Sequence, residues 1–111
     1  MTISTHVLDT ARGRPAAGLS VTLRRRITDG SWSVLGRAVT DADGRVNEVS
    51  PGPLAGGDYR LEFATADYFK ASGTAVFYPE VFVTFAAAEG EGHLHVPLLL
   101  SPFGYSTYKG Q

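Results

Sequence analysis

The chain has 111 residues, a usual length for one domain, and a formal net charge of −1 from 10 Lys or Arg and 11 Asp or Glu. Without a basic excess, binding to a nucleic-acid backbone is not expected. The absence of cysteine excludes a disulfide framework and a thiolate nucleophile, and no apolar run approaches the roughly 20 residues of a membrane span. We therefore expect one domain over residues 1–111, with no nucleic-acid or membrane partner. Because no signal-peptide pattern opens the chain, we also expect a cytoplasmic location.

Short apolar stretches separated by glycine and proline predict many short strands joined by turns. Three stretches alternate apolar and polar residues with the period of two that marks a strand with one buried face: 19–23, 59–63 and 81–85. Further strands are expected at 3–9, 32–40, 45–49, 92–100 and 103–109. The segment Asp41-Ala42-Asp43-Gly44 predicts a tight turn in which Gly44 adopts a positive φ.

One segment, Thr65–Ser72, has the pattern of a short helix, with Thr65 as its N-cap and Gly73 at its end. Seven or eight strands at regular spacing, joined to so short a helix, are typical of a β-sandwich of immunoglobulin-like design. The predicted fold class is therefore all-β.

The three histidines of the chain are the residues best suited to chemistry. In the strand that carries two of them, leucine and valine occupy the core face, so His93 and His95 point together to the opposite face, roughly 7 Å apart. Ile3 and Val7 set the inward phase of the first strand, which puts His6 outward. A lone outward histidine is usually only solvated. A pair on a face with little charge instead favours a site or an interface, where imidazole can take and return a proton near neutral pH.

Paired histidines on a strand, with a third elsewhere, are also compatible with Zn²⁺. A zinc site would normally add a carboxylate at a fixed spacing, but Asp9 falls in the opposite strand phase to His6. We therefore expect no metal and no other cofactor.

Motifs along the whole chain resemble, in order and at normal spacing, those of the 5-hydroxyisourate hydrolases of the transthyretin-like family. They are STHVLDT at 4–10 with GRPA at 13–16, TDADGR at 40–45, FYPEV at 77–81 and HLHVPLLLSPFGYSTY at 93–108. A single short motif would be weak support, whereas several in register over the whole chain are strong support.

The resemblance implies a transthyretin-like sandwich of two four-stranded sheets with one short helix. It also implies a homotetramer, a dimer of dimers, whose active sites lie in a channel between subunits. By motif position it implies that the catalytic residues are His6, Arg45 and His95. For substrate binding it implies His6, Arg45, Tyr108, His93 and Ser106.

The chain departs from the family pattern at two places. The family usually ends Tyr-Arg-Gly-Ser, whereas this chain ends Tyr108-Lys109-Gly110-Gln111. Lysine keeps the charge of arginine but lacks its planar two-pronged donor, so the tail bears on pocket shape and substrate preference. Leu94 replaces an aromatic residue between the two histidines, and by strand phase it faces the core.

The implied reaction opens an amide bond in the six-membered ring of 5-hydroxyisourate, a purine-derived small molecule of urate degradation. The product is 2-oxo-4-hydroxy-4-carboxy-5-ureidoimidazoline. We expect His95, helped by His6, to act as general base or proton relay, and Arg45 to orient the ring and stabilise developing charge. Tyr108 would hydrogen-bond the ring or close the pocket. No strained serine turn of a Ser-His-Asp enzyme is visible, so a covalent acyl-enzyme is not expected.

Three other functions stay open from the sequence. A small-molecule carrier like vertebrate transthyretin would use the same channel, although a carrier of apolar aromatic ligands has no need of paired histidines and Arg45. A divergent hydrolase of another cyclic ureide is favoured only by the altered tail. A purely structural β-sandwich is the third, and fold alone does not separate these functions.

Overall fold

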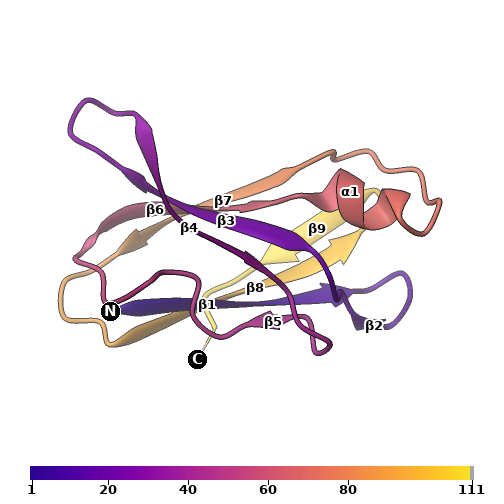
Figure 1. Ribbon diagram of the computed structural model, residues 1–111, viewed down its shortest axis with the longest axis horizontal. Helices are drawn as coiled ribbons and strands as arrows, with labels where there is room; N and C mark the ends of the chain where they lie inside the picture. The colour runs from indigo at the N-terminus through magenta and orange to yellow at the C-terminus, as the bar shows by residue number, and fades with distance from the viewer. Residues whose placement is uncertain (111) are drawn as a thin grey trace.

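Figure 1 shows the computed structural model of the chain, which describes residues 1–110. Within that range the chain forms nine strands and one α-helix. In chain order they are β1 (Thr2–Asp9), β2 (Arg14–Pro15), β3 (Ser20–Arg26), β4 (Trp32–Val39), β5 (Arg45–Val46), β6 (Gly57–Phe63), α1 (Thr65–Lys70), β7 (Val81–Ala87), β8 (His93–Ser101) and β9 (Gly104–Thr107). The all-β prediction is confirmed, each of the eight predicted strands overlaps an observed one, and β2 is additional.

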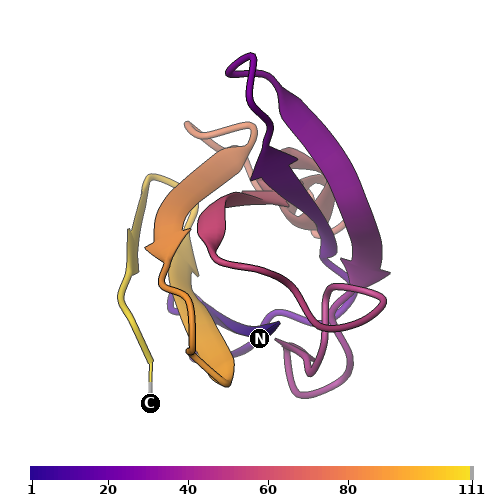
Figure 2. The ribbon, with the colours of Figure 1, turned by 90° about the vertical axis from the view of Figure 1, so that its left-hand side faces the viewer.

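The strands form two sheets that face each other as layers (Figures 1 and 2). One has the order β4-β3-β6-β7, and the other the order β2-β1-β8-β9 with β5 also paired to β1. The second sheet therefore has five strands rather than the expected four, because the chain folds back after the turn at Gly13 and pairs Pro15 with Leu8. Every pairing is antiparallel except that of β1 with β8, which is parallel.

The core between the sheets is built from the inward positions of the period-two pattern. Its largest fully buried apolar side chains are Tyr59, Phe63, Ile3, Leu19, Leu23, Leu61, Leu98 and Leu100. Burying one leucine or isoleucine side chain contributes roughly 1.5–3 kcal/mol. Burial of these residues therefore determines which face of each strand points into the core. The alternate residues of β1 and β8 then have to point outward.

The strand expected at 45–49 is shorter in the structure. Only Arg45–Val46 pairs as β5 with β1, after which the chain loops outward. It returns at Val49, whose N–H donates to the Ile3 carbonyl at 2.9 Å. From Val46 to Val49 the chain advances three residues, whereas β1 advances only two, from Thr5 back to Ile3. This one extra residue interrupts the regular ladder after Val46.

The start of α1 corrects one prediction. Thr65 is not the N-cap: the cap position is Ala64, with no side-chain hydrogen bond to the helix. Thr65 is fully buried, and its Oγ1 donates to the Tyr78 carbonyl at 2.7 Å. Its hydroxyl therefore fastens the helix to the segment before β7 instead of capping it.

The end of α1 follows the prediction for Gly73. The regular helix stops at Lys70, and the chain continues in turns to Gly73, which has a φ of 68°. The Gly73 N–H donates to the Lys70 carbonyl and the Thr74 N–H to the Phe69 carbonyl, both at 3.0 Å. This is the Schellman ending that glycine favours. Within residues 1–110 there is no helix both long and apolar enough to cross a bilayer.

Asp9, at the end of β1, has a structural role. Its side chain is fully buried and accepts hydrogen bonds from the Tyr68 hydroxyl at 2.8 Å and from the Arg12 N–H at 3.0 Å. Burial and then the neighbouring Asp9 carboxylate raise the pKa of Tyr68 above its ordinary value. The carboxylate thus ties the end of β1 to α1 and to the following turn.

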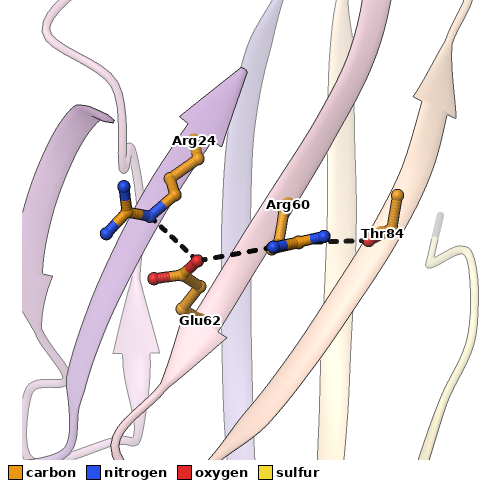
Figure 3. A network of polar contacts seen from close by, with 4 residues as sticks. All are labelled: Arg24, Arg60, Glu62 and Thr84. Carbon is orange, nitrogen blue, oxygen red and sulfur yellow. Dashed lines mark hydrogen bonds and ion pairs between the residues drawn. The ribbon is translucent and has the colours of Figure 1, made fainter. Parts of the chain in front are cut away.

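Charged side chains gather on the outer face of the four-stranded sheet (Figure 3). Glu62 pairs with Arg24 at 2.8 Å and with Arg60 at 4.0 Å, and Arg60 Nε donates to Thr84 at 3.4 Å. The Arg60 guanidinium also lies 4.1 Å from the centre of the Trp32 ring. Trp32 is therefore a packing residue of this face. The histidines lie on the other sheet.

Candidate active site

The parallel pairing of β1 with β8 sets their outward side chains next to one another. The outward pairs are Thr2 with His93, Ser4 with His95, and His6 with Pro97. Leu94 and Val96, the alternate residues of β8, are only 5% and 7% exposed, so the predicted strand phase and the core position of Leu94 are confirmed. All three imidazoles consequently belong to the outer face of the five-stranded sheet.

Arg45 reaches this face through β5, which pairs His6 directly with Arg45. The His6 Nε2 lies 2.9 Å from the carbonyl oxygen of Asp43. A carbonyl only accepts, so Nε2 carries the proton. In the neutral ring, Nδ1 is therefore the nitrogen with a free lone pair.

The turn before β5 is held in place from two sides. The carboxylate Oδ1 of Asp41 accepts from the N–H groups of Asp43 and Arg45, each at 2.9 Å. The Gly44 carbonyl accepts from the Val7 N–H at 2.7 Å. Gly44 has a φ of 74°, as the sequence predicted. Asp41 and Gly44 thus position the guanidinium-bearing Arg45 and the carbonyl that orients His6.

We expect Asp41→Ala to lower the free energy of unfolding by about 1–3 kcal/mol, because two backbone N–H groups lose a charged acceptor. Asp41→Asn keeps an acceptor oxygen and should lose less than half as much. The matched control is Asp43→Ala, which removes an equal charge from an exposed side chain of the same turn. Urea denaturation would measure all three, and equal losses for Asp41→Ala and Asp43→Ala would show that Oδ1 does not hold the turn.

A hydroxyl joins the two histidines of β8. Ser4 Oγ lies 2.8 Å from Nε2 of His93 and 2.7 Å from Nδ1 of His95, and the Thr2 hydroxyl contacts Nδ1 of His93 at 2.5 Å. Sequence reasoning assigned no site role to Ser4, although its outward strand phase was known. The missing signal was the parallel partner, because only the β1–β8 register sets Ser4 between the two rings.

His95 lies where a positive charge on its ring is disfavoured. Its pKa lies below the ordinary value of 6.5, first because the ring is partly desolvated and then because Arg45, His6 and His93 disfavour a further positive charge. Its Nδ1 is bonded to Ser4, so Nε2 is left for a ligand. A half-buried neutral imidazole with one free nitrogen beside a guanidinium is suited to general-base chemistry.

Ser106 and Tyr108 lie beside β8, but within residues 1–110 neither side chain is hydrogen-bonded to a histidine. Ser106 pairs with Leu99, and the register around Thr107 places Tyr108 opposite Pro97. The Tyr108 side chain is 58% exposed. The structure thus places Ser106 on β9 and Tyr108 directly after it, beside β8, without a hydrogen bond from either side chain to His6, His93 or His95.

The C-terminal tail packs directly on His95. The Gly110 N–H donates to the His95 carbonyl at 2.8 Å, and a Cβ at Gly110 would lie 2.7 Å from Cδ2 of the His95 ring. The tail therefore has room only for glycine at this position. Lys109 forms an exposed ion pair with Glu91 at 2.9 Å, and Gln111, the other departure in the tail, lies outside the described residues.

The sequence profile of the family described as HIUase/Transthyretin matches residues 3–110. The chain belongs to this family. A 5-hydroxyisourate hydrolase from Caulobacter vibrioides is 50% identical over 113 aligned positions, which cover 97% of this chain and 96% of that protein. The resemblance stated from the motifs is therefore confirmed.

Solved structures of this HIUase/Transthyretin family share the fold closely. A 5-hydroxyisourate hydrolase from Klebsiella pneumoniae superposes with a TM-score of 0.89 at 35% identity, over all of both chains. A transthyretin from Sparus aurata superposes with a TM-score of 0.91 at 34% identity, over 98% of this chain and 96% of that chain. The transthyretin-like fold is thus confirmed, and since both kinds of protein match it equally well, function has to be argued from the site.

Metal ligation was the alternative for the three histidines. Within residues 1–110, no group of three or more His, Asp or Glu side chains is arranged to hold a metal ion. Both nitrogens of His93 are hydrogen-bonded, and His6 and His95 each have one nitrogen bonded to the protein.

Proposed function

We propose that this protein is a 5-hydroxyisourate hydrolase that opens the six-membered ring of its substrate in urate degradation. The observation that carries the proposal is the convergence of Arg45 and His6 on the half-buried His95, in a chain half identical to a hydrolase of that name. One polar group able to accept a proton thus stands beside groups able to hold an anion. A carrier of apolar aromatic ligands would not need this set.

In the mechanism that we propose, Nε2 of His95 accepts a proton from water as the water oxygen attacks the ring carbonyl carbon. The negative charge that develops on the carbonyl oxygen is stabilised by Arg45, whose exposed side chain forms no ion pair within residues 1–110. The proton on His95 then passes to the leaving ring nitrogen as the carbon–nitrogen bond breaks. His6, with Nδ1 free, orients the substrate or the attacking water, and His93, Ser106 and Tyr108 line the site around it.

We also propose that the chain forms a single domain over residues 1–111, and that four copies of it assemble into a homotetramer that completes the site. An apolar cavity of about 320 Å³ opens between the sheet edges β7 and β9, with Phe85, Val96 and Tyr108 in its lining. Phe103, in the turn that leads into β9, is 70% exposed. Large exposed aromatic side chains at open sheet edges favour pairing of subunits there. Light scattering coupled to size-exclusion chromatography would give the mass, and a monomer at micromolar concentration would contradict the tetramer.

The experiment that tests the function is the generation of 5-hydroxyisourate in situ from urate, with its decay followed with and without the protein. The expected result is a decay that accelerates in proportion to protein concentration and yields 2-oxo-4-hydroxy-4-carboxy-5-ureidoimidazoline. Unchanged decay together with tight binding of an iodinated phenol would support a carrier instead. Cytoplasmic location is part of the same proposal and can be checked by cell fractionation.

We expect kcat/KM to fall on acidification with a midpoint below pH 6.5, because only neutral His95 accepts a proton and its pKa is depressed. Arg45→Gln removes one of the positive charges that lower the pKa of His95, so the titration midpoint of the His95 ring should move toward higher pH. An NMR titration of the ring measures this shift independently of activity. A midpoint unchanged by Arg45→Gln would show that the guanidinium does not act on His95.

Prolonged dialysis against EDTA should leave the hydrolysis rate unchanged, because the proposed mechanism uses no metal. The control is a second aliquot dialysed against EDTA and then supplied with Zn²⁺. A rate that falls on chelation and returns only with Zn²⁺ would replace the imidazole mechanism with a metal-assisted one.

A further inference from the structure

The Ser4 side chain lies beneath the two histidines of β8. The residue is only 6% exposed, and its hydroxyl is within 2.8 Å of both His93 Nε2 and His95 Nδ1. Both rings belong to β8 and Ser4 belongs to the adjacent parallel strand β1, so this contact is built from two paired strands rather than from a loop. No other hydroxyl within residues 1–110 touches both rings.

A hydroxyl has a single proton, which restricts the protonation of its two neighbours. If Ser4 donates to Nε2 of His93, then Nδ1 of His95 has to donate to Ser4. In this arrangement Nε2 of His95 has the free lone pair, which is the state a general base needs. The tautomer of His95 is therefore tied to that of His93 through one hydroxyl group.

We propose that Ser4 relays a proton between His95 and His93 during turnover. The inference rests on the proposed function, because it extends the role of His95 as the base. When His95 Nε2 accepts a proton from water, the proton on its Nδ1 passes to Ser4 Oγ, and the hydroxyl proton of Ser4 passes to His93 Nε2. His93 then carries the positive charge, and His95 is neutral with its proton on Nε2. When His95 Nε2 gives its proton to the leaving nitrogen, the two other transfers reverse. His95, Ser4 and His93 then return to their starting protonation states.

The relay moves positive charge from an unfavourable place to a favourable one. His95 is half-buried and faces Arg45 on β5 and His6 on β1, so an imidazolium there is disfavoured. His93 lies at the exposed start of β8, where water solvates a cation. The remaining ionisable groups nearby belong to the tail: Tyr108, and Lys109, whose charge is paired with Glu91. His93 thereby acquires a function in proton transfer in addition to lining the site.

The test compares Ser4→Ala with Ser4→Thr, which keeps a hydroxyl at the same position. Ser4→Ala should lower kcat by about 10²-fold with little change in KM, at the low end of the usual contribution of a proton-transfer group, and Ser4→Thr should recover most of the rate. Ser33→Ala, an exposed serine on β4, is the matched control and should behave as the unsubstituted protein. Nitrogen-15 NMR provides a readout besides rate: neutral His95 should carry its proton on Nδ1 in the unsubstituted protein and lose that preference in Ser4→Ala.

His93→Gln removes the end of the relay and leaves Ser4 in place. Its kcat should fall by a similar factor, and the double variant with Ser4→Ala should be no slower than either single variant, because both interrupt one path. If Ser4→Ala keeps the rate and the His95 tautomer while His95→Ala is inactive, the relay is wrong and the proposed function stands. If His95→Ala also keeps its activity, the proposed site itself is wrong. The relay would likewise be wrong if the fold-decrease in kcat of the double variant equalled the product of the decreases in the two single variants.

Discussion

Replacing His95 by alanine is expected to lower kcat by on the order of 10²–10⁴, the usual contribution of a general base. Partial burial of the ring and the charges of Arg45, His6 and His93 lower the pKa of His95 and so favour its neutral form. Its Nδ1 is already bonded to Ser4, which leaves Nε2 to act on water. Removing the ring takes away the proton acceptor and leaves the backbone of β8 unchanged, so the fold should persist.

His6→Ala and Arg45→Ala should also lose activity strongly, since they remove the neighbouring imidazole and the charge opposite the developing oxyanion. Arg37→Ala, an exposed arginine on β4 of the other sheet, is the control for Arg45→Ala and should retain full activity. Turnover of 5-hydroxyisourate and the assembly mass should be measured on each variant. If His6→Ala, Arg45→Ala and His95→Ala all hydrolyse the substrate at the unsubstituted rate, the site is misassigned.

Outside the proposed catalytic residues His6, Arg45 and His95, Gly44→Ala is expected to have the largest effect on both stability and activity. Its φ of 74° costs a side-chain-bearing residue roughly 1–2 kcal/mol. A Cβ there would also lie 2.3 Å from the Val7 carbonyl oxygen, which belongs to the backbone of β1. The turn would have to move away from β1, losing the Val7–Gly44 hydrogen bond and the positions of Asp43 and Arg45. We expect a total loss of about 3 kcal/mol in the free energy of unfolding.

Gly18→Ala separates backbone strain from the close approach. Gly18 has a similar φ of 78°, but a Cβ there would have no atom within 4 Å. This variant should lose only the strain contribution and keep full activity, whereas Gly44→Ala should also be slow at saturating substrate. Thermal or urea denaturation measures the first quantity, and the hydrolysis assay the second. Equal losses of stability in the two variants would show that the turn can move without cost.

Much of this architecture is predictable because strand patterns and turn chemistry are local. The period of two placed Leu94 in the core and the three imidazoles outside, and Asp41–Gly44 gave the turn with its positive φ. The prediction of Thr65 as the N-cap was wrong because its hydroxyl donates to a distant acceptor, the Tyr78 carbonyl. A capping rule considers only neighbouring residues, so it has no means of detecting that partner.

The chain's own residues determined the strand phases, the turn at Gly44, the outward histidines and, through the motifs, the expected set of His6, Arg45 and His95. Only the tertiary structure decided which of these groups meet. The parallel pairing of β1 with β8 sets Ser4 between two imidazoles some 90 positions away, and the docking of a turn on β1 gives His6 its carbonyl partner. Side-chain direction is a local property of a strand, whereas register between strands depends on how the whole core packs.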